Sequence, residues 1–174
     1  MDKALLKTAH QGLRIMDVAL RASHVALSEE FDPKYQDIPR DIQLLQRTVR
    51  SETVEVEDDG SPHHLFRVFV RLGIRWIREA ESAAKTAEAS KEDADNVDVL
   101  AVIEATFVAE YDMVKELEQP ALDEFALHNA PWHIWPYWRE YVANQCARLN
   151  MPKATMPMQC LAPKEKSPEG DKSR

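Results

Sequence analysis

The sequence offers few side chains whose types and spacing suit catalysis or metal binding. His63 and His64 lie close to Asp58 and Asp59, a set of residue types that can ligate a metal ion. Adjacent side chains of a strand point to opposite faces, so the two imidazoles would not converge on one ion. We interpret this segment as the polar end of a hairpin and predict no metal site.

Two carboxylates and three arginines are the next candidates. Glu104 and Glu110 share one face of an expected strand but lie roughly 20 Å apart at ~3.3 Å per residue, too far for a catalytic carboxylate pair. Arg67, Arg71 and Arg75 alternate along another expected strand. We predict cross-strand ion pairs between these arginines and glutamates in preference to a nucleic-acid site, because Phe69 is the one aromatic residue on the face of the arginines.

No recognised catalytic motif is present. The chain lacks a Gly-rich phosphate loop and the Gly-x-Ser-x-Gly and Cys-x-x-Cys patterns. Its two cysteines, Cys146 and Cys160, have neither metal-ligand spacing nor an evident activating group. We interpret both as small apolar residues in a reducing compartment, and we expect no enzymatic activity and no cofactor.

Length and charge restrict the class of protein further. With 174 residues, 44% of them hydrophobic, the chain suits one folded domain, predicted over 1–160, and a disordered tail over 161–174. The net charge of −8 disfavours nucleic acid and anionic lipid as partners. The longest apolar run, Val99–Ile103, is far shorter than the ~20 residues of a membrane span. We therefore expect a cytoplasmic protein without membrane insertion.

Apolar periodicity predicts strands first and helices afterwards. Leu5, Leu6, Ala9 and Leu13 have helical spacing, which predicts a short helix over 2–12 that stops at Gly12. The parity of apolar residues changes within 13–27, which predicts a strand with a β-bulge near Asp17. Further strands are predicted over 47–56, 66–76 and 97–113, with a surface crossing over 29–40 before Ile42. The acidic stretch 79–96 is predicted to be an exposed excursion, either helical or disordered.

Prolines organise the last third of the chain. Residues 120–128 favour one or two helical turns, and Pro136 is predicted to open a long helix, Pro136–Asn150, because the residue before a proline avoids the helical region. This order is typical of an α+β fold in which a four-stranded antiparallel sheet is covered on one face. Such a protomer has little interior for all its aromatic residues, so we expect the tryptophan-rich segment 132–141 to contribute to self-association or to partner binding.

One segment resembles a known family. Residues 134–142 read Ile-Trp-Pro-Tyr-Trp-Arg-Glu-Tyr-Val and are followed by Arg148 and Pro152. The pattern resembles the helix opening of SecB export chaperones, Leu-Phe-Pro-Tyr-x-Arg-Glu-x-Ile, with Arg and Pro at the same spacing. It is similar in particular to the divergent SecB-like chaperones found with toxin–antitoxin systems.

The resemblance implies a SecB-like sheet and helix, with protomers paired into dimers and dimers into a tetramer. Tyr137, Trp138, Tyr141 and Val142 would then lie at subunit contacts. By the same resemblance, Ile42, Leu44 and Leu45 of the crossover segment would bind clients. Val102 and Glu104 would occupy the place where SecB docks the SecA motor, although the first strand has Ala22, Ser23 and His24 where that family has an acidic residue.

The function implied is that of an ATP-independent holdase chaperone for unfolded or nascent proteins. Its clients would be either exported preproteins or an antitoxin. The alternative is a small-ligand-binding or assembly domain on the same scaffold, because fold does not dictate function.

Overall fold

The computed structural model describes residues 1–58, 61–79 and 98–158. Its elements are, in chain order, α1 (Lys3–Gly12), β1 (Leu13–Leu27), β2 (Arg40–Asp58), β3 (Ser61–Arg78), β4 (Val99–Met113), α3 (Gln119–His128) and α4 (Ala130–Arg148). The expected excursion over 79–96, apart from Glu79, and the expected tail over 161–174 lie outside the described residues. No helix in the described part of the chain is long and apolar enough to cross a membrane.

The N-terminal helix α1 is present as predicted. Asp2 caps its first turn, since its carboxylate accepts hydrogen bonds from the backbone N–H groups of Ala4 and Leu5. Gly12 ends the helix beside α3, where a Cβ atom would lie 2.9 Å from both Cδ atoms of Leu117. A larger residue at this position would therefore push away the residue that leads into α3.

Four strands form one antiparallel sheet, as the sequence predicted, and their order in the sheet is β1-β4-β3-β2. A register shift between Ile15 and Asp17 confirms the predicted β-bulge, and a second shift lies between Leu20 and Ala22. β2 and β3 form the predicted hairpin, in which Asp58 pairs with Ser61. β1 and β2 are consequently the two outer strands.

β2 begins seven residues before the predicted strand at Arg47. Residues 40–46 pair with residues 72–78 of β3, so Ile42, Leu44 and Leu45 are strand residues. Their predicted place in the crossover segment is therefore wrong. The prolines of the preceding stretch hid this start, because the turn signals of Pro33 and Pro39 continue up to the first paired residue.

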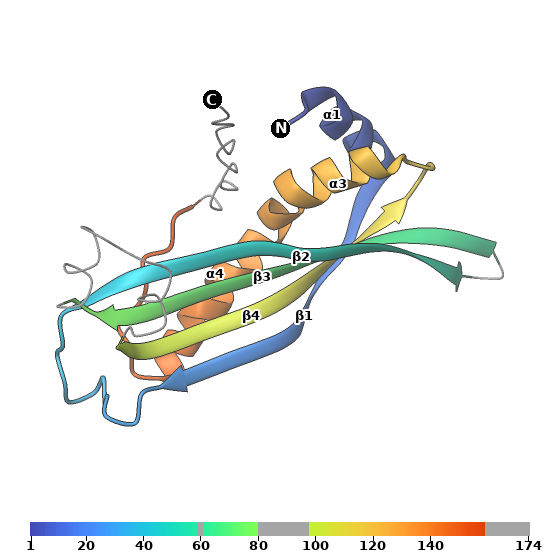
Figure 1. The fold of residues 1–174 in the computed structure, drawn as a ribbon. Helices are drawn as coiled ribbons and strands as arrows, with labels where there is room; N and C mark the ends of the chain where they lie inside the picture. Colours follow the sequence, from blue (N-terminus) through green and yellow to red (C-terminus); the bar gives the residue numbers. More distant parts are fainter. Residues whose placement is uncertain (59–60, 80–97, 159–174) are drawn as a thin grey trace, which may run out of the picture.

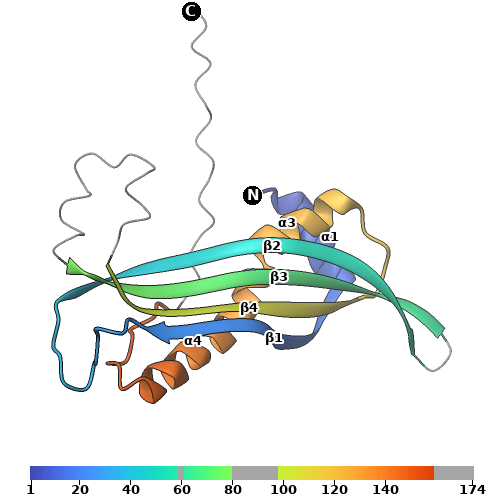
Figure 2. The same ribbon diagram turned by 60° about the horizontal axis from the view of Figure 1, so that its bottom comes forward.

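α3 and α4 cover one face of the sheet and leave the other face uncovered (Figure 1). In Figure 2 both helices lie behind the four strands. The alternation predicted for β3 and β4 is confirmed. Their helix-facing side chains are buried in the core: Phe66, Val68, Val70, Leu72, Ile74 and Trp76 on β3, and Ala101, Ile103, Ala105, Phe107, Ala109 and Tyr111 on β4.

α4 begins at Ala130, six residues earlier than predicted, and Pro136 lies inside it. Pro131 occupies the first turn, where the missing N–H is harmless, so this proline opens the helix in place of Pro136. Pro136 has no N–H to donate to the carbonyl group of Trp132. Its neighbours Ile134 and Trp135 are buried, and their packing offsets the lost hydrogen bond.

The interior holds more aromatic side chains than the sequence analysis allowed. Trp76, Trp135 and Trp138 are buried, and of the four tryptophans only Trp132 is exposed, at 46%. The expected surplus of aromatic residues is therefore smaller than predicted, and within the segment 132–141 it consists of Trp132 and Tyr137. Helix α3 and the extended segment after α4, which buries Met151 and Met156, enlarge the core beyond the predicted sheet and single helix.

Candidate functional site

Exposed aliphatic side chains on the two outer strands form the most prominent apolar surface of the sheet. They form two groups on opposite edges of the sheet, named together the edge cluster: Ile15, Met16 and Leu20 on β1, and Ile42, Leu44, Leu45 and Val49 on β2. Inner strands β3 and β4 bury their helix-facing apolar side chains, whereas each outer strand has a neighbouring strand on one side only. Three of these residues were predicted from the sequence. Of the other four, Ile15 and Leu20 lie opposite helix-facing residues of β4, whereas Met16 and Val49 lie at register shifts, where periodicity does not indicate a face.

The three predicted client-binding residues do not share a single face. Ile42 lies opposite Trp76 and Leu44 opposite Ile74, so both are on the helix-covered side of the sheet. Leu45 lies opposite Gly73 on the uncovered face. Ile42, Leu44 and Leu45 are 47%, 37% and 41% exposed, so all three offer apolar surface to a ligand.

The outer edge of β2 suits an extended polypeptide. An outer strand presents backbone N–H and C=O groups that have no partner strand on one side. Burial of one exposed aliphatic side chain contributes up to roughly 1.5–3 kcal/mol, and this contribution has no directional requirement. An unfolded segment of variable sequence can therefore bind here through several modest contacts.

The four residues predicted at subunit contacts divide into two pairs. Trp138 and Val142 are completely buried inside the protomer and have no surface for a partner, so their assignment to an interface is wrong. Tyr137 is 49% exposed on α4. Tyr141 is partly buried, with its ring 6.1 Å from that of Phe107 and 6.2 Å from that of Trp138. Only Tyr137 and Tyr141 remain as predicted contact residues.

The uncovered face has paired charges. Arg67 forms an ion pair with Glu110 at 2.7 Å, and Arg71 forms one with Glu104, which confirms the predicted cross-strand pairing. Val102 lies on the same face, two positions from Glu104, and is partly buried. Docking of a motor protein through Val102 and Glu104 stays a prediction, and the Glu104 carboxylate is already engaged by an arginine.

The titratable groups with perturbed pKa values belong to the interior. Burial raises the pKa of Tyr111, whose hydroxyl lies 2.9 Å from Nδ1 of His133. Burial raises the pKa of the Cys146 thiol, against an opposing hydrogen bond from the backbone of Ala154. A buried, protonated thiol agrees with the interpretation of Cys146 as a small apolar residue, while Cys160 lies outside the described residues.

The described residues contain no group of three His, Cys, Asp or Glu side chains placed to hold a metal ion. His63 and His64 occupy adjacent positions of β3, opposite Val56 and Glu55 of β2, in the hairpin where the sequence analysis placed them. Adjacent strand positions point to opposite faces, so the two imidazoles do not converge on one point.

Comparison with known proteins identifies the fold. No protein-family model matches the chain, and no curated protein does. Among solved structures, the chain is similar to the SecB-like chaperone Rv1957 of Mycobacterium tuberculosis, determined in complex with a ChAD peptide from the HigA1 antitoxin Rv1956. The TM-score is 0.63 at 18% sequence identity, and the match covers 91% of this chain and 99% of that chain. The predicted SecB-like fold is thereby confirmed.

Proposed function

We propose that this chain, with its SecB-like fold, is an ATP-independent holdase chaperone that binds unfolded segments of client proteins. The edge cluster supports this proposal most directly. It places exposed aliphatic side chains beside unpaired strand edges, on a fold that in a similar chaperone accompanies a bound peptide. Binding of this kind requires neither a cofactor nor catalysis, and we propose that the protein is not an enzyme.

An aggregation assay tests the proposal. The wild-type protein should suppress light scattering by a chemically denatured substrate without ATP. A variant with Ile42→Ser and Leu44→Ser should lose most of this effect, because two apolar contacts of up to roughly 1.5–3 kcal/mol each are removed. Both side chains are exposed, so the thermal unfolding temperature should change little.

Val114→Ser is the matched control, since Val114 is an exposed apolar residue just after β4, at the opposite end of that strand from Ala101, the residue level with Ile42 through Trp76. It should leave suppression of aggregation intact. A wild-type protein that does not delay aggregation, or a double variant as active as the wild type, would contradict the proposal.

Two client classes fit a binding mode of this kind, namely exported preproteins and antitoxins. The similar chaperone was determined with an antitoxin peptide, and this favours an antitoxin as the client here. His24 stands opposite Glu104, where a SecA-docking surface would need an acidic residue, so we propose that SecA is not the partner. A cytoplasmic location follows from a client that is captured before it folds or is exported.

We further propose that protomers assemble into dimers and that dimers form a tetramer. Tyr137 and Tyr141 lie on α4 near the β1 side of the sheet, because Tyr141 contacts Phe107 and Phe107 pairs with Leu20 of β1. Exposed Ile15 and Leu20, which belong to the β1 part of the edge cluster, extend this apolar surface along the outer strand, so the assembly would leave the β2 part of the cluster free for clients. A second copy of the chain would cover both the tyrosines and the strand.

A further inference from the structure

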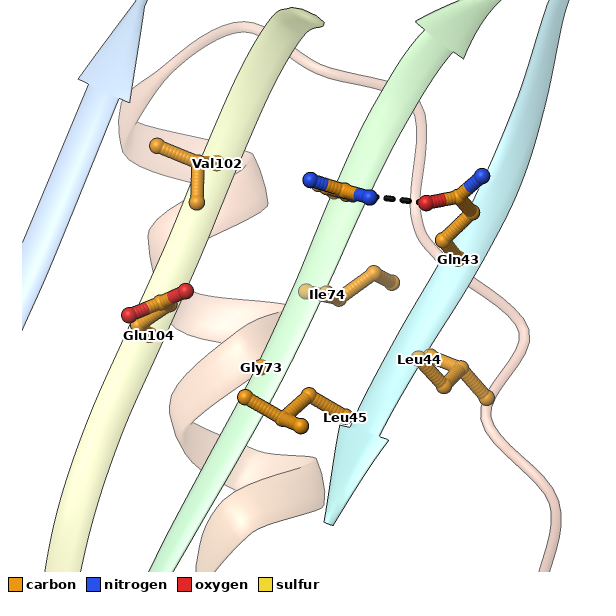
Figure 3. A pocket seen from close by; sticks show the side chains of 8 residues that line it. Gln43, Leu44, Leu45, Gly73, Ile74, Val102 and Glu104 are labelled. Carbon is orange, nitrogen blue, oxygen red and sulfur yellow. Dashed lines mark hydrogen bonds between the residues drawn. The ribbon is translucent and has the colours of Figure 1, made fainter. Parts of the chain in front are cut away.

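The uncovered face of the sheet has a hollow centred on Gly73 of β3. Glycine has no side chain, so the floor of the hollow between Leu45 of β2 and Glu104 of β4 is backbone (Figure 3). A Cβ atom at Gly73 would lie 3.3 Å from Cβ of Leu45 and 3.3 Å from Cγ of Glu104. The hollow has a volume of about 260 Å³, enough for a short side chain, and Val102 adds to its apolar wall.

One arginine lines this hollow and two others lie beside it on the same face of the sheet. Arg75 lines it, and its Nε donates a 2.7 Å hydrogen bond to Oε1 of Gln43. Arg71 lies on the same face of β3, two residues before Gly73, and Arg47 of β2 lies directly opposite Arg71. Among the described residues that line the hollow, Glu104 has the one carboxylate, and Arg71 is its ion-pair partner. Arg47 and Arg75 have no acidic partner within the described ranges.

Arg47 lies opposite Arg71 but lacks the acidic partner that Arg71 has in Glu104. Like charges directly opposite each other on neighbouring strands destabilise a sheet, and Glu104 offsets this effect only on the Arg71 side. An anion bound beside Arg47 would offset the remainder. The chain as a whole has a net charge of −8, so this concentration of positive charge runs against its composition.

We propose that the Gly73 hollow binds acidic side chains of a protein partner, presented by an extended segment rich in Asp or Glu. A carboxylate placed over Gly73 can form charge-assisted hydrogen bonds with the arginines, while its methylene groups contact Leu45 and Val102. The inference goes beyond the proposed function, because Ile42 and Leu44 belong to the other face of the sheet, only the Leu45 side chain serves both surfaces, and the partner bound here need not be unfolded.

Fluorescence anisotropy with labelled peptides tests this site on the full chain. A peptide of alternating Glu and Ala presents all its carboxylates on one side when extended, and the matched peptide of Lys and Ala reverses the charge. The acidic peptide should bind and the basic one should not. A variant with Arg47→Ala and Arg75→Ala should weaken binding by at least about tenfold, since charge-assisted hydrogen bonds are lost. Gly73→Leu should weaken it similarly by filling the hollow.

Arg14→Ala is the control, because Arg14 is exposed on the same face, far along β1 at the position opposite Asp112. It should change binding by less than about twofold, as expected for a remote surface charge. Arg47→Ala alone should not lower the thermal unfolding temperature, whereas a purely structural arginine would.

Three results would overturn the proposal. The acidic peptide does not bind, or Arg14→Ala weakens binding as much as the double variant does, or single-stranded oligo(dT) binds the same arginines more tightly than the acidic peptide. The last result would assign the surface to nucleic acid. Arg47 is exposed and Arg75 is half-buried, so the arginine substitutions test the site even if Gly73→Leu does not fold.

Discussion

At the scale of single residues, the contact between Tyr111 and His133 couples the stability of the protein to pH. Burial lowers the pKa of His133, and the nearby His10 lowers it further when charged. Tyr111 is fully buried and pairs with Nδ1 of His133, and its ring packs edge-on against Phe125 at 4.9 Å between centroids. A neutral imidazole is therefore part of the folded interior.

The sign of the pH dependence follows from this lowered pKa. In the unfolded chain His133 takes up a proton near its ordinary pKa of ~6.5, whereas the folded protein resists protonation until lower pH. The stabilisation is complete above the unfolded value and is lost as the pH falls through the folded value. Urea unfolding should give a smaller free energy at pH ~5 than at pH ~7.5.

A substitution of His133 tests how much this residue contributes to the pH dependence of the unfolding free energy. His133→Gln keeps a hydrogen-bonding group near Tyr111 but does not titrate, so the difference in unfolding free energy between the two pH values should shrink. His24→Gln, at an exposed position on β1, should leave the difference as in the wild type. An unchanged pH dependence in His133→Gln would show that other groups are responsible.

At the scale of elements, Pro136 interrupts the hydrogen bonding of α4 without ending the helix. Its side chain is exposed, and the carbonyl group of Trp132 has no N–H partner at this point. Pro136→Ala restores that hydrogen bond and should raise the free energy of unfolding by about 1–3 kcal/mol, as measured by urea denaturation. Pro131→Ala, in the first turn, should change it by less than about 0.5 kcal/mol. Equal effects of the two substitutions would contradict this assignment.

The strands could be predicted from the sequence more fully than the start of α4. Strict alternation predicted β3 and β4, and a change of apolar parity predicted the bulge at Asp17, because strand side chains alternate faces with a fixed period. The start of α4 was missed because the avoidance of helix before a proline is a local preference. Burial of Ile134, Trp135 and Trp138 under the sheet outweighs this preference.

The candidate site was predicted only in part for a related reason. Periodicity shows which side chains share a face, but it does not show how far the helices extend across that face. Leu44 and Leu72 both lie on the helix-covered side, yet only Leu72 is buried, because β3 is an inner strand and β2 an outer one. Trp138 and Val142 were assigned to an interface because the sequence does not show how many apolar side chains the core of a single protomer can bury.

At the scale of the whole molecule, the helix-covered side of the sheet ends in apolar surface along β1, which we assign to a second copy of the chain. Tyr137→Glu would place a charge in that contact and should shift the protein to smaller assemblies in size-exclusion chromatography with light scattering. Tyr35→Glu, an exposed tyrosine between β1 and β2, is the matched control and should leave the mass unchanged. A wild-type protein that is monomeric would contradict the assignment.

The central claim is that the edge cluster binds unfolded polypeptide, and hydrogen–deuterium exchange tests it most directly. The protein is compared with and without a permanently unfolded, reduced and alkylated client, and protection is read along each strand. Backbone amides of residues 41–49 should exchange more slowly with the client bound, and those of α1 and α3 should not change. Protection confined to the helices, with exchange along both outer strands unchanged, would contradict the claim.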